Sequence, residues 1–308
     1  MFRKMKKRAL KPIVKWAGGK SQLIEEISSR YPNGLGVTIK KYAEPFVGGG
    51  AILLDILAHY DLDEIYISDI NAELINMYSK VKTDVDNVIK LLHSYQEQYI
   101  PMNNTARKDF FYARRNEFNS LIINENSKNS LDSAALFIFL NRTCFNGLYR
   151  VNRKGLYNVP MGAYKNPLIC DERNLRAVSA ALQKVTIVCA DYRASAEFVD
   201  ENTLVYFDPP YRPLSVTSNF TSYTENVFDD AAQAELAAYA EQLMAKGAFV
   251  MLSNSDPKNS NPEDDFFDKL YSCLHIDRIF ASRMINSNAD ARGKISELFI
   301  CNYERRIL

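Results

Sequence analysis

The chain has 308 residues, 47% hydrophobic and 24% charged, with 38 Lys and Arg against 37 Asp and Glu. That composition indicates one large or two smaller globular domains and excludes disordered and fibrous chains. No apolar run approaches the about 18 residues of a membrane span, and no apolar stretch of a secretory signal follows the basic start, so we expect a cytoplasmic protein. Five widely spaced cysteines without a CxxC pair favour free thiols over disulfides or a zinc site.

Short β-branched and aromatic runs alternate with helical patterns along most of the chain. We expect strands at residues 42–46, 64–68, 185–189, 204–207, 248–253 and 297–303. We expect helices at residues 51–59, 71–93, 171–182 and 229–246, with Asp229 capping the last one. This alternation predicts an α/β fold with a mainly parallel sheet, whose ligands bind beyond the carboxyl ends of the strands.

Residues 77–164 interrupt this alternation. Helices are expected at 107–119 and 131–140, followed by a polar loop region at 141–167. Ten basic residues stand against four acidic ones over residues 105–165, and the first 20 residues carry eight basic residues and no acidic one. The total charge of +1 therefore conceals two cationic segments, which suit a polyanionic partner. We predict a mostly helical domain at 77–169, inserted into a sheet domain formed by residues 1–76 and 170–308.

A glycine-rich turn follows the first expected strand, in the run Glu44-Pro-Phe-Val-Gly-Gly-Gly. Glycines at a strand-to-helix turn let the backbone approach a nucleotide closely, although the spacing is not GxGxxG and a plain tight turn is an equal alternative. Asp69 ends the next expected strand, where a carboxylate can accept both ribose hydroxyls of a nucleoside. The alternative is that Asp69 or Asn71 caps the following helix.

The run Lys15-Trp-Ala-Gly-Gly-Lys-Ser contains Gly-Lys-Ser but is not a phosphate-binding P-loop, because Val14 stands where that pattern needs glycine. Its lysines and Trp16 could clamp an anionic or aromatic ligand, or Trp16 could pack into the core.

The most informative run is Leu204-Val-Tyr-Phe-Asp-Pro-Pro-Tyr, in which an apolar strand delivers Asp208 to its carboxyl end. Two prolines fix the following backbone and offer no N–H groups, so the Asp208 side chain and the Pro209 carbonyl can act as outward acceptors. Tyr211 adds a flat surface for stacking. Two acceptors beside an aromatic face suit a planar ring that carries an amino group.

These runs together resemble the Dam-like adenine-specific DNA methyltransferases with a D-P-P-Y motif. The resemblance continues through residues 139–150, 157–165, 213–223 and 292–298, in the order of the family and over nearly the whole chain. It implies a Rossmann-like catalytic domain with an inserted target-recognition domain. It also implies transfer of a methyl group from S-adenosylmethionine, without a metal, to the N6 amine of an adenine flipped out of duplex DNA, leaving S-adenosylhomocysteine.

The resemblance also assigns roles to individual residues. The catalytic motif is Asp208, Pro209, Pro210 and Tyr211, in which two acceptors make the adenine amine a better nucleophile. Expected cofactor contacts are Trp16, Ala17, Lys20, Phe46, Gly48, Asp69, Asp191, Tyr192 and Asp208. Without the resemblance, Asp191 is a helix cap. Expected DNA contacts are Lys15, Phe145, Asn146, Leu148, Arg150, Asn158, Pro160, Ser215, Thr217 and Asn219.

One departure concerns the target sequence. Relatives that methylate GATC carry arginine between the glycine and tyrosine of the run Met161-Gly-Ala-Tyr, where this chain has Ala163. A bidentate arginine–guanine contact contributes about 1–3 kcal/mol of base discrimination. Either Lys165 or Arg153 replaces it, or the target is a site other than GATC.

Two other functions stay open at this point: methylation of the amine of cytosine or of an RNA base, and non-catalytic DNA binding by a relative that keeps the fold as a scaffold. The intact D-P-P-Y run disfavours the scaffold. We expect a monomer in a restriction–modification, phage or housekeeping setting, in the first case beside a restriction endonuclease with the same target.

Overall fold

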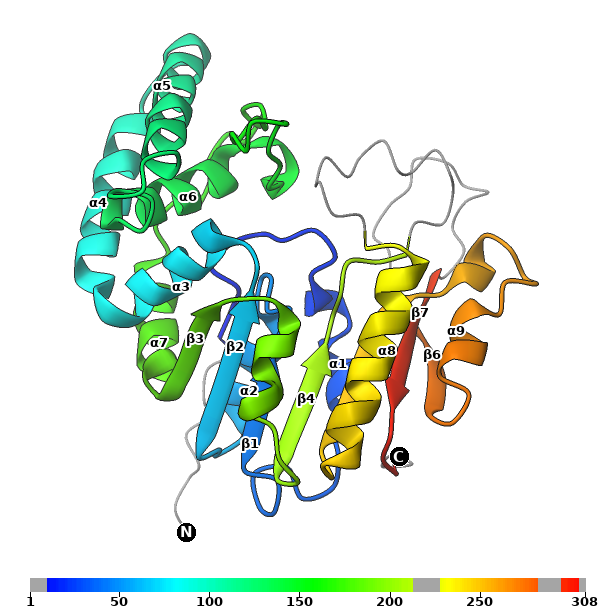
Figure 1. Cartoon of the computed structure of the whole chain (residues 1–308). Coiled ribbons are helices and arrows are strands. Elements are labelled where there is room, and N and C mark those ends of the chain that lie inside the picture. The colour runs from blue at the N-terminus through cyan, green and yellow to red at the C-terminus, as the bar shows by residue number, and fades with distance from the viewer. Residues whose placement is uncertain (1–9, 213–227, 282–294, 305–308) are drawn as a thin grey trace. The chain divides into compact units, whose positions relative to one another are not determined.

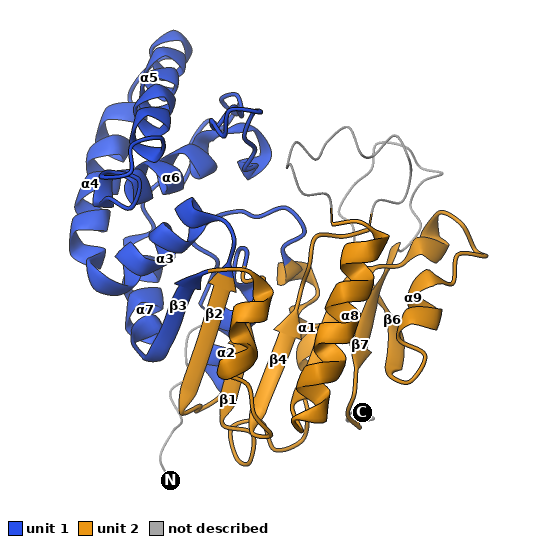
Figure 2. Cartoon of the chain, viewed as in Figure 1, with its two compact units in different colours: residues 1–19, 48–59, 69–189 blue, residues 20–47, 60–68, 190–308 orange. Residues whose placement is uncertain are grey.

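Contacts along the chain divide it into two compact units (Figure 2). The computed structural model describes residues 10–212, 228–281 and 295–304. The first unit comprises residues 1–19, 48–59 and 69–189, and the second comprises residues 20–47, 60–68 and 190–308. The chain therefore passes five times from one unit to the other. The assignment of residues 77–169 to target recognition stays a prediction.

A mixed sheet is the centre of the second unit (Figure 1). Its strands follow the order β2-β1-β4-β5-β7-β6. The pairs β2–β1, β1–β4 and β4–β5 are parallel, whereas β7 pairs antiparallel with both β5 and β6. This confirms the predicted α/β fold with a mainly parallel sheet. The bounds are β1 Lys41–Glu44, β2 Glu64–Asp69, β4 Thr203–Phe207, β5 Phe249–Ser255, β6 His275–Ala281 and β7 Ile295–Cys301.

Strand β4 lies in the middle of this sheet, and all five of its residues are buried. A strand buried on both faces reads as an unbroken apolar run, which is why Leu204-Val-Tyr-Phe was recognisable in the sequence. Because β1, β4 and β5 are parallel, their carboxyl ends meet at one edge. The segments that follow Glu44, Phe207 and Ser255 therefore share that edge.

Three helices of the second unit are α1 (Ile24–Ser28), α8 (Asp230–Ala245) and α9 (Phe266–Leu270). Asp229 caps α8 as predicted, since its side chain accepts a hydrogen bond from the Ala232 amide at 2.9 Å. Residues 232–243 of α8 include several alanines, which favour a helix.

The first unit is helical apart from β3 (Val185–Cys189) and short turns among its described residues. Helix α6 is buried along most of its length and packs against α3, α4 and α5. Such a helix is apolar all round because neighbours cover every side. The bounds are α2 Ala51–His59, α3 Ala72–Thr83, α4 Val85–Tyr99, α5 Asn104–Ile122, α6 Leu131–Thr143 and α7 Glu172–Ala181.

Two predictions of secondary structure were wrong. The helix expected over 71–93 is broken at Asp84, whose φ of −149° is not helical and whose carboxylate accepts from the Asn87 side chain at 3.0 Å. Asp competes with the helix by such local hydrogen bonds. Strand β6 was missed because Asp277 and Arg278 interrupt its apolar pattern. These two charges pair with Arg30 and with Asp268, so the strand keeps them satisfied.

Candidate functional site

Asp208 lies directly after β4 and forms an ion pair with Lys20. The Lys20 ammonium lies 2.6 Å from Oδ1 of Asp208 and donates a hydrogen bond to Oδ2 at 2.8 Å. Only 3% of the Lys20 side chain and 19% of the Asp208 side chain are exposed. Burial raises the pKa of Asp208, and the adjacent Lys20 opposes that rise. The sequence predicted Lys20 as a cofactor contact but gave no sign of its ion pair with Asp208.

Tyr211 joins the same cluster through its ring and its hydroxyl. The Lys20 ammonium lies over the Tyr211 ring, 4.6 Å from its centre, and the hydroxyl donates to Glu297. A Glu297 oxygen also lies 4.0 Å from the Lys20 ammonium. Glu297 was missed because nothing in the local sequence of β7 marks it as a site residue. Its position follows from the antiparallel register, which sets Glu297 opposite Ser255 at the carboxyl end of β5.

Side chains from α8 and β5 hold the Asp208-Pro-Pro-Tyr211 turn in place. Gln233, fully buried in α8, donates to the Pro210 carbonyl at 3.1 Å. Asn254, equally buried in β5, donates in turn to the Gln233 side-chain oxygen at 3.0 Å. Because both amides lie in the core and are hydrogen-bonded, the turn is fixed by a rigid network.

Arg212 fixes the far end of the same turn. It donates to Asp230 at 2.6 Å and to Asp264 at 2.6 Å, and its guanidinium lies 4.5 Å from the centre of the Phe266 ring. Nothing in the sequence pattern pointed to this role.

Phe46 and Tyr192, both expected at the cofactor, stack on each other in the second unit. Their ring centres are 5.3 Å apart with planes inclined by 27°, and Tyr192 is 4% exposed. Asp191 is exposed and accepts a hydrogen bond from the Arg193 amide at 3.0 Å. It thereby caps the short 3₁₀ helix Tyr192–Glu197, which is the role expected of Asp191 without the family resemblance.

In the first unit, Asp69 is tied to the glycine turn. Its carboxylate accepts from the Gly48 amide at 3.1 Å and from the Asn71 amide at 2.9 Å. Burial raises the pKa of Asp69, and these amides oppose the rise. The cap of α3 is Asn71, which accepts from the Leu74 amide at 2.8 Å. Asp69 is therefore not that cap, and its place beside the glycines suits a hydroxyl-bearing ligand.

Trp16 lies against the same glycine turn. Gly48 has a φ of 46°, and a Cβ there would lie 2.9 Å from Trp16 Cδ1. The indole also stacks on Tyr149, with ring centres 5.8 Å apart. Trp16 is partly exposed and Ala17 is exposed. A flat ring, a backbone without Cβ and a partly buried carboxylate within one unit fit a nucleoside such as that of S-adenosylmethionine.

The residues expected to contact DNA form a second group in the first unit. Phe145 is 51% exposed, and Asn146 is exposed with a φ of 54°. Leu148 is partly exposed, so neither apolar side chain is core. Arg150 donates to the Asn158 side chain at 2.8 Å, and the Pro160 carbonyl accepts from the Phe145 amide at 2.9 Å.

Lys15 lies beside these residues. A Cβ on Gly147 would lie 2.6 Å from Lys15 Cβ, and the Lys15 ammonium donates to the Tyr164 hydroxyl at 2.9 Å. Arg153, Ala163 and Lys165 are exposed. The remaining expected DNA contacts, Ser215, Thr217 and Asn219, lie outside the described residues.

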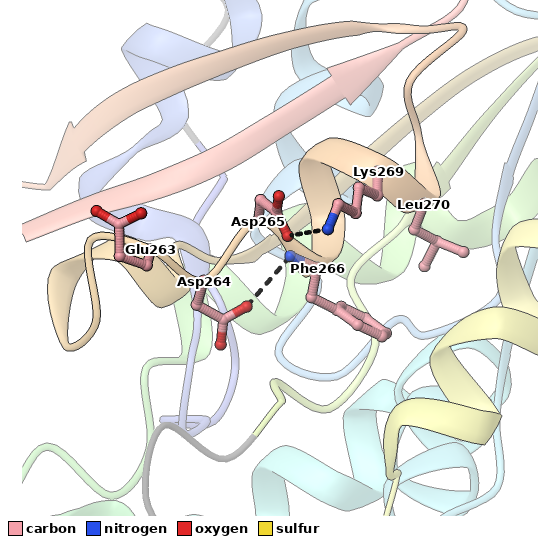
Figure 3. A pocket seen from close by; sticks show the side chains of 6 residues that line it. All are labelled: Glu263, Asp264, Asp265, Phe266, Lys269 and Leu270. Atoms are coloured by element: carbon pink, nitrogen blue, oxygen red, sulfur yellow. Dashed lines mark hydrogen bonds and ion pairs between the residues drawn. The ribbon is translucent and has the colours of Figure 1, made fainter.

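An open pocket lies beside α9, lined by Glu263, Asp264, Asp265, Phe266, Lys269 and Leu270 (Figure 3). Asp265 pairs with Lys269 at 3.0 Å, and Asp264 accepts from the Phe266 amide at 3.1 Å. Three acidic side chains on such a surface repel phosphates, so the pocket does not suit DNA.

Two features are absent from the part of the chain that the structure describes. No helix there combines the length and apolarity that crossing a membrane requires. No group of three or more His, Cys, Asp or Glu side chains there is arranged to hold a metal ion.

Comparison with known proteins agrees with these observations. Residues 16–285 match the family described as D12 class N6 adenine-specific DNA methyltransferase. The type II methyltransferase M.MjaIII of Methanocaldococcus jannaschii is 47% identical, over 96% of this chain and 99% of that protein. The type II methyltransferase M1.LlaDCHI of Lactococcus lactis is 36% identical, over 96% of both chains. The DNA adenine methylase of Escherichia coli is 35% identical, over 92% of both. The chain belongs to the D12 class of N6 adenine-specific DNA methyltransferases.

Proposed function

We propose that Asp208, Pro209, Pro210 and Tyr211 carry out the methyl transfer in this enzyme. The observation that carries the proposal is the buried Lys20–Asp208 pair at the end of β4. Burial alone would favour a protonated carboxyl, which cannot accept a hydrogen bond with both oxygens. The adjacent Lys20 ammonium opposes the rise in pKa that burial causes, so it favours the ionised carboxylate, and its contacts hold the two oxygens in place.

The chemistry requires acceptors more than it requires a base. The lone pair of the adenine amine is delocalised into the ring, so the amine is a poor nucleophile. Asp208 and the Pro209 carbonyl accept hydrogen bonds from the two N–H groups of the amine. These bonds favour a pyramidal nitrogen with a localised lone pair. Tyr211 offers its ring for stacking of the flipped base. S-adenosylmethionine supplies the methyl group.

For the cofactor, we infer two groups of contacts. In the first unit, Trp16 and Ala17 would hold its methionine end, Gly48 would contact it through the glycine turn, and Asp69 would accept hydrogen bonds from its ribose hydroxyls. In the second unit, the contacts that the resemblance implies are Lys20, Phe46, Asp191, Tyr192 and Asp208. The Asp69 carboxylate beside the Gly48 amide supports the ribose role.

The DNA-binding role falls to the exposed loops of the first unit. Phe145, Asn146, Leu148 and Arg150 would enter the duplex near the target, with Lys15, Asn158 and Pro160 around them. Ser215, Thr217 and Asn219 would hold phosphates. The target sequence is GATC only if Lys165 or Arg153 takes over the guanine contact that Ala163 cannot make.

We further infer that the enzyme acts as a monomer in the cytoplasm, without a metal, and alongside a restriction endonuclease with the same target if its setting is restriction–modification. Methylation of both strands of a short target by one catalytic site requires two separate encounters, which a monomer allows. The absence of a metal and the restriction–modification setting are inferred from the resemblance of the motifs. The location is inferred from the sequence pattern, and the monomer from a sequence without an extended heptad or a large apolar stripe.

The test is transfer of labelled methyl groups from S-adenosylmethionine to mixed-sequence duplex DNA, with sequencing of the methylated positions. Wild type is expected to yield N6-methyladenine at one short sequence. Asp208→Asn should lose at least about a hundredfold in rate while DNA binding persists, because a placed acceptor has lost its charge. The matched control is Asp200→Asn, since Asp200 precedes the other end of β4 and pairs with Lys41 at 2.9 Å.

Each result is decisive. Wild-type label in cytosine would replace the adenine assignment. Absence of transfer to DNA would leave the scaffold alternative, unless RNA offered in a parallel reaction is labelled, which would assign an RNA substrate. Near-normal transfer by Asp208→Asn would remove Asp208 from the catalytic role. Loss of transfer in Asp200→Asn would indicate that any disturbance of β4 abolishes activity, so that the effect of Asp208→Asn would not show a catalytic role.

A further inference from the structure

Tyr149 connects the DNA-facing loop of the first unit with the cofactor residues of the same unit. It lies between Leu148 and Arg150, within the loop proposed to enter the duplex. Its ring stacks on Trp16, with centres 5.8 Å apart and planes inclined by 20°. Neither the sequence motifs nor the proposed function gives Tyr149 a role.

The hydroxyl of Tyr149 reaches the other side of the cofactor residues. It donates a hydrogen bond to Glu73 at 3.0 Å. Glu73 lies in the first turn of α3, directly after the segment Asp69-Ile-Asn71 that ends β2 and caps the helix. One side chain therefore contacts the indole on one side and the helix that follows the ribose-binding carboxylate on the other.

The backbone of the loop is tied to the same place by Asn141, which is 3% exposed. Its side-chain oxygen accepts from the Lys15 amide at 2.8 Å. Its side-chain nitrogen donates to the carbonyls of Lys15 and Gly147, both at 2.9 Å. Lys15 precedes Trp16 and Gly147 precedes Leu148, so displacement of the loop displaces the indole.

The far side of the indole meets the glycine turn, where a Cβ on Gly48 would lie 2.9 Å from Trp16 Cδ1 and one on Gly49 would lie 3.0 Å from Trp16 Cβ. The indole therefore occupies the space that a side chain on Gly48 or Gly49 would need, so it lies directly against the backbone of the turn. Contact is thus continuous from Tyr149 through Trp16 to Gly48, and close packing transmits displacement.

We propose that Tyr149 is a positioning residue that couples recognition of DNA by residues 145–150 to binding of S-adenosylmethionine. This rests on the proposed function of both sets of residues. Engagement of DNA by the loop fixes Tyr149, and Tyr149 fixes Trp16 and Glu73 beside the cofactor. Because coupling between two binding sites is reciprocal, the cofactor equally favours engagement of the target.

The experiment measures the coupling factor, which is the ratio of the dissociation constants of S-adenosylhomocysteine without and with saturating target duplex. The duplex carries the sequence found by methylation sequencing, and S-adenosylhomocysteine prevents turnover. Trp16 is the sole tryptophan of the chain, so its fluorescence reports binding directly, and calorimetry gives an independent value. A coupling factor of at least about fivefold is expected for wild type.

Two variants separate the contacts of Tyr149. Tyr149→Phe keeps the stacking ring and removes the bond to Glu73, so the coupling factor should fall by at least twofold. Tyr149→Leu removes both contacts and should bring the factor close to one. The control is Tyr95→Leu in α4, because Tyr95 is a buried tyrosine that packs on Phe139 and not on Trp16. Tyr95→Leu should keep the wild-type coupling factor. A general loss of stability would instead lower the factor in both leucine variants.

A wild-type factor of one overturns the proposal. So does an unchanged factor in Tyr149→Leu or, if that variant does not fold, in Tyr149→Phe. A fall in Tyr95→Leu equal to that in Tyr149→Leu overturns it as well. Failure of wild type to methylate DNA or to bind S-adenosylhomocysteine counts against the proposed function instead, so the two failures are distinguishable.

Discussion

Replacing Lys20 by methionine tests the electrostatic account of Asp208. Methionine keeps most of the length of the side chain but removes the charge, leaving the Asp208 carboxylate 19% exposed and without its cation. Removing one partner of a buried pair costs about 3–5 kcal/mol of unfolding free energy. Since water still reaches part of Asp208, we expect a loss near the lower limit, about 3 kcal/mol.

Removing the charge of the other partner, by Asp208→Asn, should lower the free energy of unfolding by less than Lys20→Met does. Lys20 keeps a second carboxylate, because Glu297 lies 4.0 Å from its ammonium. The double variant should cost less than the sum of the single ones, with a coupling energy of about 2 kcal/mol, as for contacting residues. Lys41→Met is the control: its pair with Asp200 is 39% exposed on the aspartate side and should be worth less than about 1 kcal/mol.

The assay is urea unfolding without ligand, followed by circular dichroism and by the fluorescence of Trp16, because coincident transitions are required for two-state analysis. The cost of Lys20→Met should shrink as the pH falls through the pKa of Asp208, which burial raises, since a protonated carboxyl needs no cation. Additivity of Lys20→Met and Asp208→Asn within about 0.5 kcal/mol would refute the reasoning. So would a cost of Lys20→Met that is independent of pH.

Two further substitutions probe the neighbouring features. Gly48→Ala and Gly155→Ala both place a Cβ at positive φ, which costs about 1–2 kcal/mol, but only the Cβ at Gly48 meets another group, Trp16. Urea unfolding should therefore show a loss of unfolding free energy at least about 1 kcal/mol larger for Gly48→Ala, because overpacking against Trp16 adds to the backbone cost. Equal losses would contradict the assigned contact. Tyr211→Phe keeps the ring and loses the bond to Glu297, so methyl transfer should slow by no more than about tenfold, since one charged hydrogen bond contributes about 1.5 kcal/mol. A loss as large as that of Asp208→Asn would assign the hydroxyl a direct part in the reaction.

The sequence predicted the sheet better than the contacts around Asp208. A buried parallel strand such as β4 can be predicted from its apolar run. The position of Asp208 in the site then follows, because Asp208 comes directly after that strand. The position of Glu297 does not follow, because its nearness to Tyr211 depends on the antiparallel register of β7 against β5. A register between strands far apart in the chain leaves no local pattern.

The same reasoning explains which individual roles were ambiguous. Asp69 and Asn71 are both good caps, and only the hydrogen bonds show that Asn71 caps α3 while Asp69 turns to Gly48. Gln233 and Asn254 were missed for a related reason. Buried amides in a helix and a strand resemble surface residues in a sequence until their partners are known.

The repeated passage of the chain between its two units bears on how such enzymes exchange specificity. No single break in the backbone releases either unit, so a fusion at one junction cannot replace one of them. The junctions Ser68–Asp69 and Cys189–Ala190 enclose the longest stretch of the first unit in one continuous segment. A recombination event with those two ends would transfer the loop of residues 145–150, which we propose to contact DNA, and with it Tyr149, Glu73 and Asp69. It would leave Trp16 and Gly48 behind, so a successful donor gene must encode an aromatic partner that the resident indole accepts.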